Sequence, residues 1–353
     1  MLFGKKDKPV LPETADVSAA PYVKNTGRTY GIMLDVIVAL LPAAAWGVYV
    51  FGPRALCIMT ISVVCSVLFE FLFRLILRRK CSVGDLSAVV TGMLIGMNLP
   101  ASAPYWAPAA GAFAAIVAVK QLFGGIGRNY VNPALAGIAV LRLLPAWLDR
   151  FPAPFDKPDW KCISLAGSNY SAFRPTPVEV LTGGAAPDVP TLDLFLGKCG
   201  GTIGGVSVLM LLLGGLYLLS RGVISWSIPL SFVGSAAVLS VLFPVTGDRL
   251  GSVTCEVLCG GLLLGAFFMA TDYSTSPVTD TGKIIYGIGC GVLTFLARRY
   301  VGGNEGVFIA ILIMNLPVRL IDKLTMPRVF GTGKNDPIPE NIKKKDDKNE
   351  NNG

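Results

Sequence analysis

The stretch Ser171-Ala-Phe-Arg-Pro-Thr-Pro-Val-Glu-Val-Leu181 lies inside a polar segment, from Asp149 to about Gly200, that divides an otherwise apolar chain. Five apolar segments precede the polar segment and five follow it. Repeated apolar segments of this kind are typical of helices in a lipid bilayer. The sequence therefore predicts an all-α integral membrane protein of about ten transmembrane helices. The predicted helices cover residues 32–51, 55–77, 86–99, 107–123 and 133–148, then 204–219, 224–243, 252–270, 284–297 and 307–321.

The composition agrees with a membrane protein. The 353 residues are 52% hydrophobic and 15% charged, whereas soluble domains carry about a quarter charged residues. The net charge is +8, but the basic residues cluster at segment ends and in the tails, which indicates membrane topology rather than binding to nucleic acid. The chain contains no histidine, which excludes imidazole ligands and imidazole acid–base catalysis, and we predict no metal site.

The distribution of Lys and Arg predicts the topology. Basic residues gather before the first segment, after the second and fourth segments, and in the tail. Because cytoplasmic loops carry the excess of basic residues, both termini are predicted to be cytoplasmic and the central loop to lie outside. The predicted parts are a basic arm (1–30), a first five-helix repeat (31–148), an extracytoplasmic loop (149–203), a second repeat (204–325) and a cytoplasmic tail that we expect to be disordered (326–353).

The two halves show a weak internal repeat. A unit of five spans must invert its orientation when it is repeated, and inverted repeats build a pathway at their interface. Some predicted segments, such as 86–99, are short for a full span, which suggests helices that end inside the bilayer. Three matches recur in the same order at nearly constant offset: Gly47-Val-Tyr49 with Gly215-Leu-Tyr217, Gly92–Gly96 with Gly261–Gly265, and Arg128-Asn-Tyr130 with Arg298-Arg-Tyr300.

Four acidic residues lie in or at the ends of the predicted helices. A charge in the bilayer is costly, so each needs a partner or a water-filled cavity. Glu70 lies well inside its segment, with Arg74 one helical turn later, which favours a role in an ion or proton path. For Asp35 and Glu256 a role in the path and a position near the interface are equally consistent with the sequence, and Asp272 lies at a helix end. The basic residues Lys120, Arg142 and Arg319 lie near segment ends, where snorkelling to the interface is favoured.

The eight cysteines are interpreted mainly as buried small apolar residues. None forms a CxxC pair, and Cys255 and Cys259 are four residues apart, on one face if helical. Cys162 and Cys199 share the central loop and offer the alternative of a disulfide in an oxidising compartment. In the same loop, Thr176 stands between two prolines, which predicts an extended and exposed backbone. That pattern by itself is typical of a surface turn.

Three stretches together resemble a known family. They are Gly31-Ile-Met-Leu-Asp-Val-Ile-Val-Ala-Leu-Leu-Pro42, Lys120-Gln-Leu-Phe-Gly-Gly-Ile-Gly-Arg-Asn129 and Phe268-Met-Ala-Thr-Asp-Tyr-Ser-Thr-Ser-Pro277. The family contains the D subunit of Rnf electron-transport complexes and the B subunit of Na⁺-translocating NADH:quinone reductases. The resemblance runs from about residue 21 to 325, with the motifs in family order and at family spacing. The short N-terminal arm favours the Rnf type.

The resemblance implies two inverted five-helix repeats, as in urea transporters, and FMN joined by a phosphoester to a loop threonine on the outer face. The Thr-Pro of the family motif carries over at Thr176, but the small residues that precede it in the family do not. Arg174 would pair with the phosphate or with the reduced ring. The resemblance also allows a non-covalent flavin, such as riboflavin, within the membrane.

The implied function is that of one subunit of a redox-driven ion pump in the bacterial cytoplasmic membrane. The pump would pass electrons between ferredoxin and NAD and couple them to Na⁺ or H⁺ transport. The implied partners are the other Rnf subunits (A, B, C, E and G) and membrane lipid. Three alternatives stay open: the B subunit of the quinone reductase, a passive channel of the urea-transporter type, and a purely structural anchor for sibling subunits.

Overall fold

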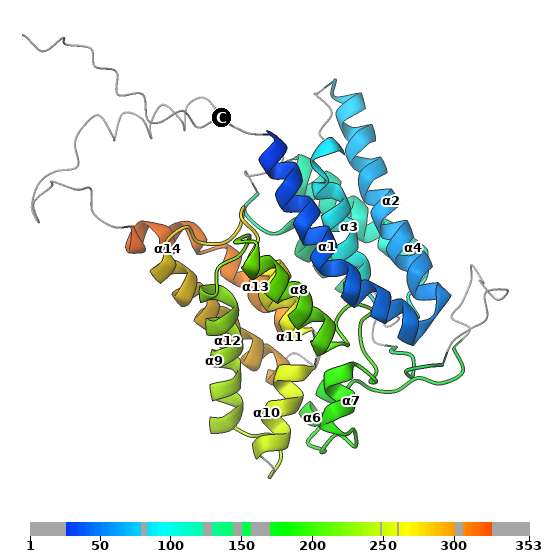
Figure 1. Ribbon diagram of the computed structural model, residues 1–353, viewed down its shortest axis with the longest axis vertical. Coiled ribbons are helices and arrows are strands. Elements are labelled where there is room, and N and C mark those ends of the chain that lie inside the picture. The colour runs from blue at the N-terminus through cyan, green and yellow to red at the C-terminus, as the bar shows by residue number, and fades with distance from the viewer. Residues whose placement is uncertain are drawn as a thin grey trace, which may run out of the picture.

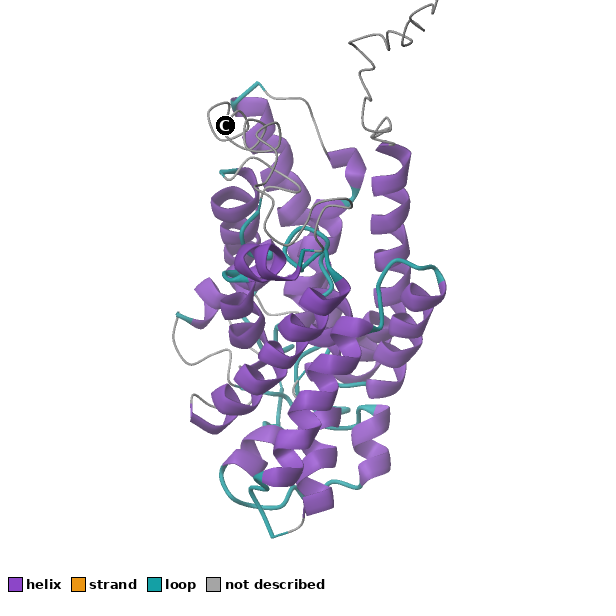
Figure 2. Cartoon of the chain, turned by 90° about the vertical axis from the view of Figure 1, so that its left-hand side faces the viewer, coloured by secondary structure: helices purple, strands orange, loops and turns teal. Residues whose placement is uncertain are grey.

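The computed structural model describes residues 26–78, 83–122, 129–143, 150–156, 170–247, 249–259, 261–300 and 306–326. Within these ranges every regular element is a helix (Figure 2). An isolated β-bridge joins Pro152 to Phe173. The predicted all-α class is therefore confirmed. Most of the predicted basic arm, the predicted tail, Cys81 and Cys162 lie outside the described residues.

The first half contains five main helices. Gly52, with a φ of 82°, ends the first helix, and Pro53 begins the second at a position where proline is favoured. The helix 87–98 ends just before Leu99-Pro100, as predicted, because the residue before a proline disfavours helical backbone. The elements are α1 Thr26–Phe51, α2 Pro53–Ile76, η1 Val83–Asp85, α3 Ser87–Asn98, α4 Trp106–Phe113, the π-helix η2 Ala114–Gln121 and α5 Pro133–Arg142.

The central loop and the second half contain the remaining helices. Two predicted helices are each broken in two: residues 252–270 at Gly261, which has a φ of 67°, and residues 307–321 at Pro317. Two short helices in the polar loop were not predicted. The elements are α6 Pro177–Thr182, α7 Thr191–Leu196, α8 Val208–Ser220, α9 Ser227–Leu242, α10 Arg249–Leu258, α11 Leu262–Leu264, the π-helix η4 Gly265–Met269, α12 Asp280–Tyr300, α13 Gly306–Asn315 and α14 Val318–Thr325.

Helix length separates two long spans from many shorter apolar helices. By length and composition, α1 and α2 are each able to cross a membrane, and a third span results if α10 and the helix 262–269 count as one span bent by 50°. The helices α3, α5, α8, α9 and α13 are apolar but shorter. The chain thus has the apolar helices of a membrane protein. The count of ten spans stays a prediction.

The helices form two groups that meet along α1 and α8. In the first group α2 packs against α3 and α4, and in the second group α9 packs against α12 and α10 (Figure 1). The contact between α1 and α8 depends on glycine, because a methyl group at Gly214 would collide with the carbonyl oxygen of Ala39. The helices α6 and α7 of the polar loop lie against α10.

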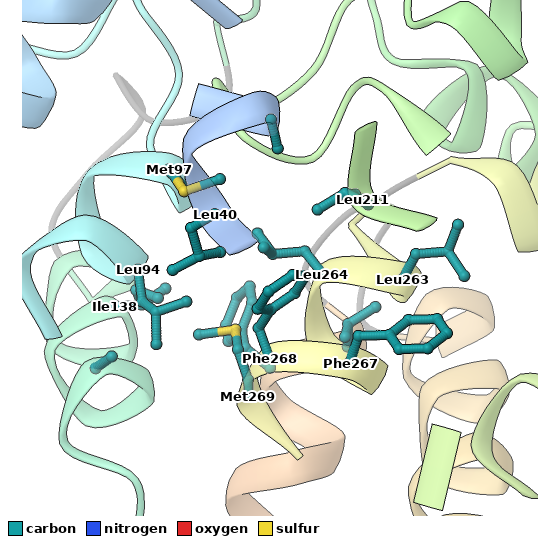
Figure 3. Packing of buried hydrophobic residues seen from close by; sticks show 14 of the residues in the cluster. Leu40, Leu94, Met97, Ile138, Leu211, Leu263, Leu264, Phe267, Phe268 and Met269 are labelled. Carbon is teal, nitrogen blue, oxygen red and sulfur yellow. The ribbon is translucent and has the colours of Figure 1, made fainter. Parts of the chain in front are cut away.

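The central core is built around the stretch 262–269. Leu40 of α1, Leu94 and Met97 of α3, and Leu211 of α8 surround it (Figure 3). Phe267, Phe268 and Met269, at the end of the π-helix η4, project into this core. In a bilayer such helices are held together by close packing rather than by exclusion of water. The core therefore joins residues from both halves of the chain.

Candidate functional site

Thr176 is the N-cap of α6. Its backbone is extended, with φ −68° and ψ 153°, as the flanking prolines predict. Its hydroxyl accepts the N–H of Glu179 at 3.2 Å, and the Glu179 carboxylate accepts the N–H of Thr176 at 3.0 Å. Thr176 in this capping box is 1% exposed, so the prediction that the residue is extended was correct and the prediction that it is exposed was wrong. The Thr-x-x-Glu spacing in the sequence was the signal for this outcome.

The segment before Thr176 is fixed to the rest of the protein. The carboxylate of Asp156 accepts hydrogen bonds from the N–H and the hydroxyl of Ser171, at 2.7 and 2.8 Å, and from the N–H of Ala172 at 2.8 Å. Desolvation acts to raise the pKa of Asp156, but these hydrogen bonds from Ala172 and Ser171 outweigh it and hold the pKa below its usual range. The hydroxyl of Tyr170 donates to the carbonyl of Phe51 at 2.8 Å, which anchors the segment to the end of α1.

The surroundings of Thr176 fit a phosphoester. The buried hydroxyl accepts one hydrogen bond, while its proton has no acceptor among the residues that the structure describes. A phosphoester would replace the hydroxyl proton and leave the Thr176 oxygen able to accept the hydrogen bond from the N–H of Glu179. The residues 171–175, including Arg174, are exposed, whereas Thr176 is buried, so a phosphate on its hydroxyl would have to extend toward this exposed segment. By contrast, Thr182 donates its hydroxyl proton to the carbonyl of Glu179 at 3.0 Å.

Glu70 lies in a buried charged cluster in the first half. Its side chain is fully buried, and its Oε2 lies 2.8 Å from the Nζ of Lys120. The amide of Gln121 donates to Oε1 at 3.1 Å, while the Nε of Arg74 lies 3.8 Å from the same oxygen. Lys120 also donates to the hydroxyl of Ser87 at 2.5 Å. The predicted pair of Glu70 with Arg74 is therefore present, but the nearer cation is Lys120.

Lys120 departs most strongly from the sequence-based expectation. It was expected to snorkel to the interface, but it is 2% exposed. It lies in the π-helix η2, whose wide turn directs both Lys120 and Gln121 toward α2. A basic residue so close to a predicted segment end gave no signal of its partner fifty positions earlier in the chain.

The second half contains another buried ion pair. The Nη1 of Arg298 lies 3.9 Å from the Oε2 of Glu256, and both side chains are buried. The guanidinium donates to the carbonyls of Glu256 and Cys259, at 2.5 and 3.0 Å, and so caps the end of α10. The predicted helix ended at residue 297, before Arg298. The helix α12 instead continues to Tyr300 and carries Arg298 inside the protein.

The other two predicted acids lie apart from these pairs. Asp35 of α1 accepts a hydrogen bond from the hydroxyl of Tyr217 at 2.9 Å and lies 3.4 Å from the Nε of Arg221, so it links α1 to the end of α8. Asp272 follows η4 and accepts hydrogen bonds from the hydroxyls of Ser274 and Thr275, at 2.8 and 3.2 Å. The four predicted acids thus occupy four separate environments.

A cavity of about 190 Å³ lies between the two halves. Its lining is mostly apolar, and Phe267 and Phe268 form part of it. Among the predicted acids, only Asp272 lines the cavity. Lys120 also lines it and forms the ion pair with Glu70, which does not line it. The polar lining residues are Ser87, Thr91, Lys120, Asn129, Asn132, Thr271, Asp272, Tyr273 and Ser274.

Two much smaller cavities lie elsewhere, the first lined by residues of both halves and the second by residues 199–261 alone. One, of about 20 Å³, is lined by Asn98, Arg142 and Met269, and the guanidinium of Arg142 lies 5.6 Å from the centre of the Phe308 ring. The other, of about 10 Å³, shares Thr202 and Gly261 with it. Arg142 was expected at the interface but is half-buried at this cavity. Arg319 is exposed and stacks on Tyr130 at 4.1 Å.

Comparison with known proteins now decides the family. The model of the NQR2, RnfD, RnfE family matches residues 16–331, which is most of the chain. The chain belongs to this family. The match includes α1 to α14 and therefore every residue of the capping box and of both buried ion pairs.

Similar members of the NQR2, RnfD, RnfE family are D subunits of ion-translocating complexes. The chain is 43% identical to the D subunit of the Na(+)-translocating ferredoxin:NAD(+) oxidoreductase complex of Acetobacterium woodii, over 90% of this chain and 96% of the relative. It is 36% identical to the D subunit of the proton-translocating complex of Clostridium ljungdahlii, with the same coverage. It is 37% identical to the D subunit of the ion-translocating oxidoreductase complex of Stutzerimonas stutzeri, over 85% of this chain and 91% of the relative. These relatives place the chain on the RnfD side of the family.

Proposed function

We propose that the chain is the D subunit of an Rnf-type complex in the bacterial cytoplasmic membrane, which passes electrons between ferredoxin and NAD and couples them to ion transport. The 43% identity to a D subunit over 90% of the chain carries this proposal. The relatives include one that is named for Na⁺ and one that is named for protons, so experiment must identify the ion. The partners would be the sibling A, B, C, E and G subunits and membrane lipid.

The proposed cofactor is FMN, attached through a phosphoester to Thr176. The buried hydroxyl whose proton has no acceptor among the described residues, and the exposed segment beside it, support this attachment. When bound, the flavin would supply one-electron chemistry at the outer surface of the membrane. Glu179 would keep α6 capped, and Arg174 would hold the phosphate by charge. The Asp156 contacts would keep the segment in place.

The attachment is tested by in-gel fluorescence of the denatured chain, purified after expression with its flavin transferase. We expect Thr176→Val to abolish covalent flavin fluorescence. Thr182→Val is the matched control, because its hydroxyl also contacts α6 but donates to a carbonyl. Fluorescence that persists in the Thr176 variant would move the attachment elsewhere.

The large cavity is the proposed place for a second, non-covalent flavin. Its apolar walls with Phe267 and Phe268 suit a flat ring, while Asn132 and Lys120 offer hydrogen-bond donors. Charged residues at this cavity are the candidates for coupling the electrons to ion movement. They are Lys120 and Asp272, which line the cavity, and Glu70, which pairs with Lys120. The amount of flavin that denaturation releases from the protein should fall in Phe268→Ala. It should be unchanged in Phe308→Ala, because Phe308 does not line this cavity.

The proposed topology has two inverted five-helix repeats with both termini in the cytoplasm. The packing supports the repeat, since α2 lies against α4 as α9 lies against α12, in matching order along the two halves. Reporters fused at the two termini should report cytoplasm, and a reporter near Thr176 should report the outside. An N-terminus found outside would overturn the orientation and the outward flavin together.

The cavity between the halves also favours a second candidate, a passive channel or transporter of the urea-transporter type. The two candidates differ in redox chemistry. A protein of the Rnf type should carry flavin absorbance after purification and co-purify with its siblings, whereas a passive channel should do neither.

A further inference from the structure

Three cysteines meet beneath α6. Cys199 follows α7, Cys255 lies in α10, and Cys259 directly follows α10. Their side chains are buried, with 5%, 1% and 4% exposed. The three side chains belong to one buried cluster. The apolar residues that pack around them come from α6 and α7: Val178, Leu181 and Leu194. Neither the flavin attachment nor the buried ion pairs use these three thiols.

Cys199 and Cys259 lie at one small cavity. Both line the same cavity of about 10 Å³, and most of its other lining residues are glycines. A disulfide needs Cβ atoms about 3.5–4.5 Å apart and tolerates little deviation. Backbone made of glycine can shift to reach that distance more easily than backbone with side chains on both sides. The glycines are Gly200, Gly201, Gly205 and Gly261.

The third thiol is poorly placed for the same bond. The N–H of Cys259 donates to the carbonyl of Cys255 at 3.0 Å, so the two residues lie on one helical turn. Side chains four residues apart on a helix have Cβ atoms about 5–6 Å apart, which is too far for a disulfide without distortion. Cys255 also does not line the small cavity that Cys199 and Cys259 share, so Cys199 and Cys259 are the pair that is placed to bond.

A fixed positive charge lies beside Cys259. The guanidinium of Arg298 donates to the carbonyl of Cys259 at 3.0 Å. This hydrogen bond holds the backbone of Cys259 in place at the end of α10. Cys199 lies in the polar loop and, like the other two cysteines, is almost fully buried.

We propose that Cys199 and Cys259 form a reversible disulfide, as a redox site separate from any flavin. The oxidant is a small-molecule disulfide. The Cys199 thiolate attacks it, and one small thiol leaves. The Cys259 thiolate then attacks the Cys199 sulfur of the mixed disulfide, and the second small thiol leaves. The two small thiols take up the two protons of the cysteines, so the protein loses two electrons and the oxidant gains them. The bond ties the loop after α7 to the end of α10 beneath α6.

The experiment uses the full chain in detergent, incubated with oxidised glutathione, alkylated with N-ethylmaleimide and mapped by mass spectrometry. We expect one linked pair of peptides, containing Cys199 and Cys259, that disappears after dithiothreitol. A link between Cys255 and Cys259, a link between Cys162 and Cys199, or glutathione adducts without any link would each overturn the proposal. Complete alkylation of Cys199 and Cys259 after oxidation would overturn it as well.

Single-residue variants identify which two cysteines form the bond. Cys199→Ser and Cys259→Ser should each lose the linked peptides, whereas Cys255→Ser and Cys162→Ser should keep them. Loss of the link in Cys255→Ser would overturn the proposed pair. Thr176→Val should keep the link, so a failure of the flavin proposal leaves this result unchanged.

Discussion

Each half of the chain buries a carboxylate beside a buried cation, but the two pairs are built differently. In the first half, Lys120 and Gln121 contact different oxygens of Glu70, at 2.8 and 3.1 Å. In the second half, Arg298 lies 3.9 Å from Glu256 and gives its hydrogen bonds to backbone carbonyls. The Oε2 of Glu256 has no hydrogen-bond partner among the described residues. The first pair is a closed ion pair, and the second is a helix cap with a carboxylate nearby.

The difference shows that the role of an ion pair does not follow from its burial and charge alone. A buried carboxylate whose oxygens are both bonded holds its cation in one place, and here that cation lines the large cavity. A buried arginine bonded to carbonyls stabilises the end of α10 whatever the state of the nearby acid. We therefore expect the first pair to act on the cavity and the second to act on the fold.

The largest expected effect is on stability, in Arg298→Leu. The substitution leaves two buried carbonyls and the Glu256 carboxylate without their cation, which should cost about 3–5 kcal/mol. The measurement is the midpoint of thermal unfolding in detergent at a fixed scan rate, together with the yield of folded protein. Arg299→Leu is the control, because this neighbouring arginine is exposed and should change the midpoint little. If both substitutions lowered the unfolding midpoint equally, Arg298 would contribute no more to stability than an exposed arginine does.

A smaller loss of stability is expected in Lys120→Met. Glu70 keeps Gln121 and Arg74 after this change, so we expect a cost of about 2–3 kcal/mol, below that of Arg298→Leu. The double variant Glu70→Gln with Lys120→Met should recover part of the loss, because it leaves neither charge unpaired. A double variant that is no more stable than Lys120→Met would mean that the two charges are not coupled. The coupling is obtained from the unfolding midpoints of the unchanged chain, the two single variants and the double variant.

The third prediction concerns ion coupling. In Glu70→Gln the ammonium that lines the cavity loses its counter-charge and should repel a cation that enters. We expect ion uptake per electron to fall several-fold in proteoliposomes of the assembled complex, while flavin content is kept. Glu256→Gln should leave the ratio unchanged, since Glu256 does not line the large cavity. The opposite result would assign the ion path to the second half.

The smallest effect is expected in Arg74→Leu. Its Nε lies 3.8 Å from Glu70, and its side chain is 17% exposed. Long and partly exposed ion pairs contribute about 1 kcal/mol or less. Expression and unfolding midpoint should therefore stay close to those of the unchanged chain. A loss as large as that of Lys120→Met would show that Arg74, rather than Lys120, is the main partner of Glu70.

The helical framework was largely predictable from the sequence. Each of the ten apolar segments contains a helix, because long apolar runs have few other stable states in a bilayer. The end of α3 at Asn98 followed from the proline two residues later. The break at Gly261 was not predicted, since a glycine inside an apolar run also fits an unbroken helix.

The site was predictable only in part. Glu70 was correctly placed in a buried position, but its partner Lys120 lies far away in sequence and is brought close by packing alone. The charge of Arg298 suggested a helix end, whereas the available backbone carbonyls let α12 bury it. For Thr176 the sequence contained the answer: the Glu three residues later marks a capping box that the flanking prolines obscured.

The π-helix η2 makes the position of Lys120 tolerant of a change in chain length. A π-turn holds more residues than an α-turn, so it behaves as an α-helix with one residue inserted. Removing a single residue within 114–119 would let the segment relax to an α-helix with Lys120 still directed toward Glu70. The same deletion in a regular α-helix would rotate every later side chain by about 100°. The ion pair should therefore survive a one-residue deletion here.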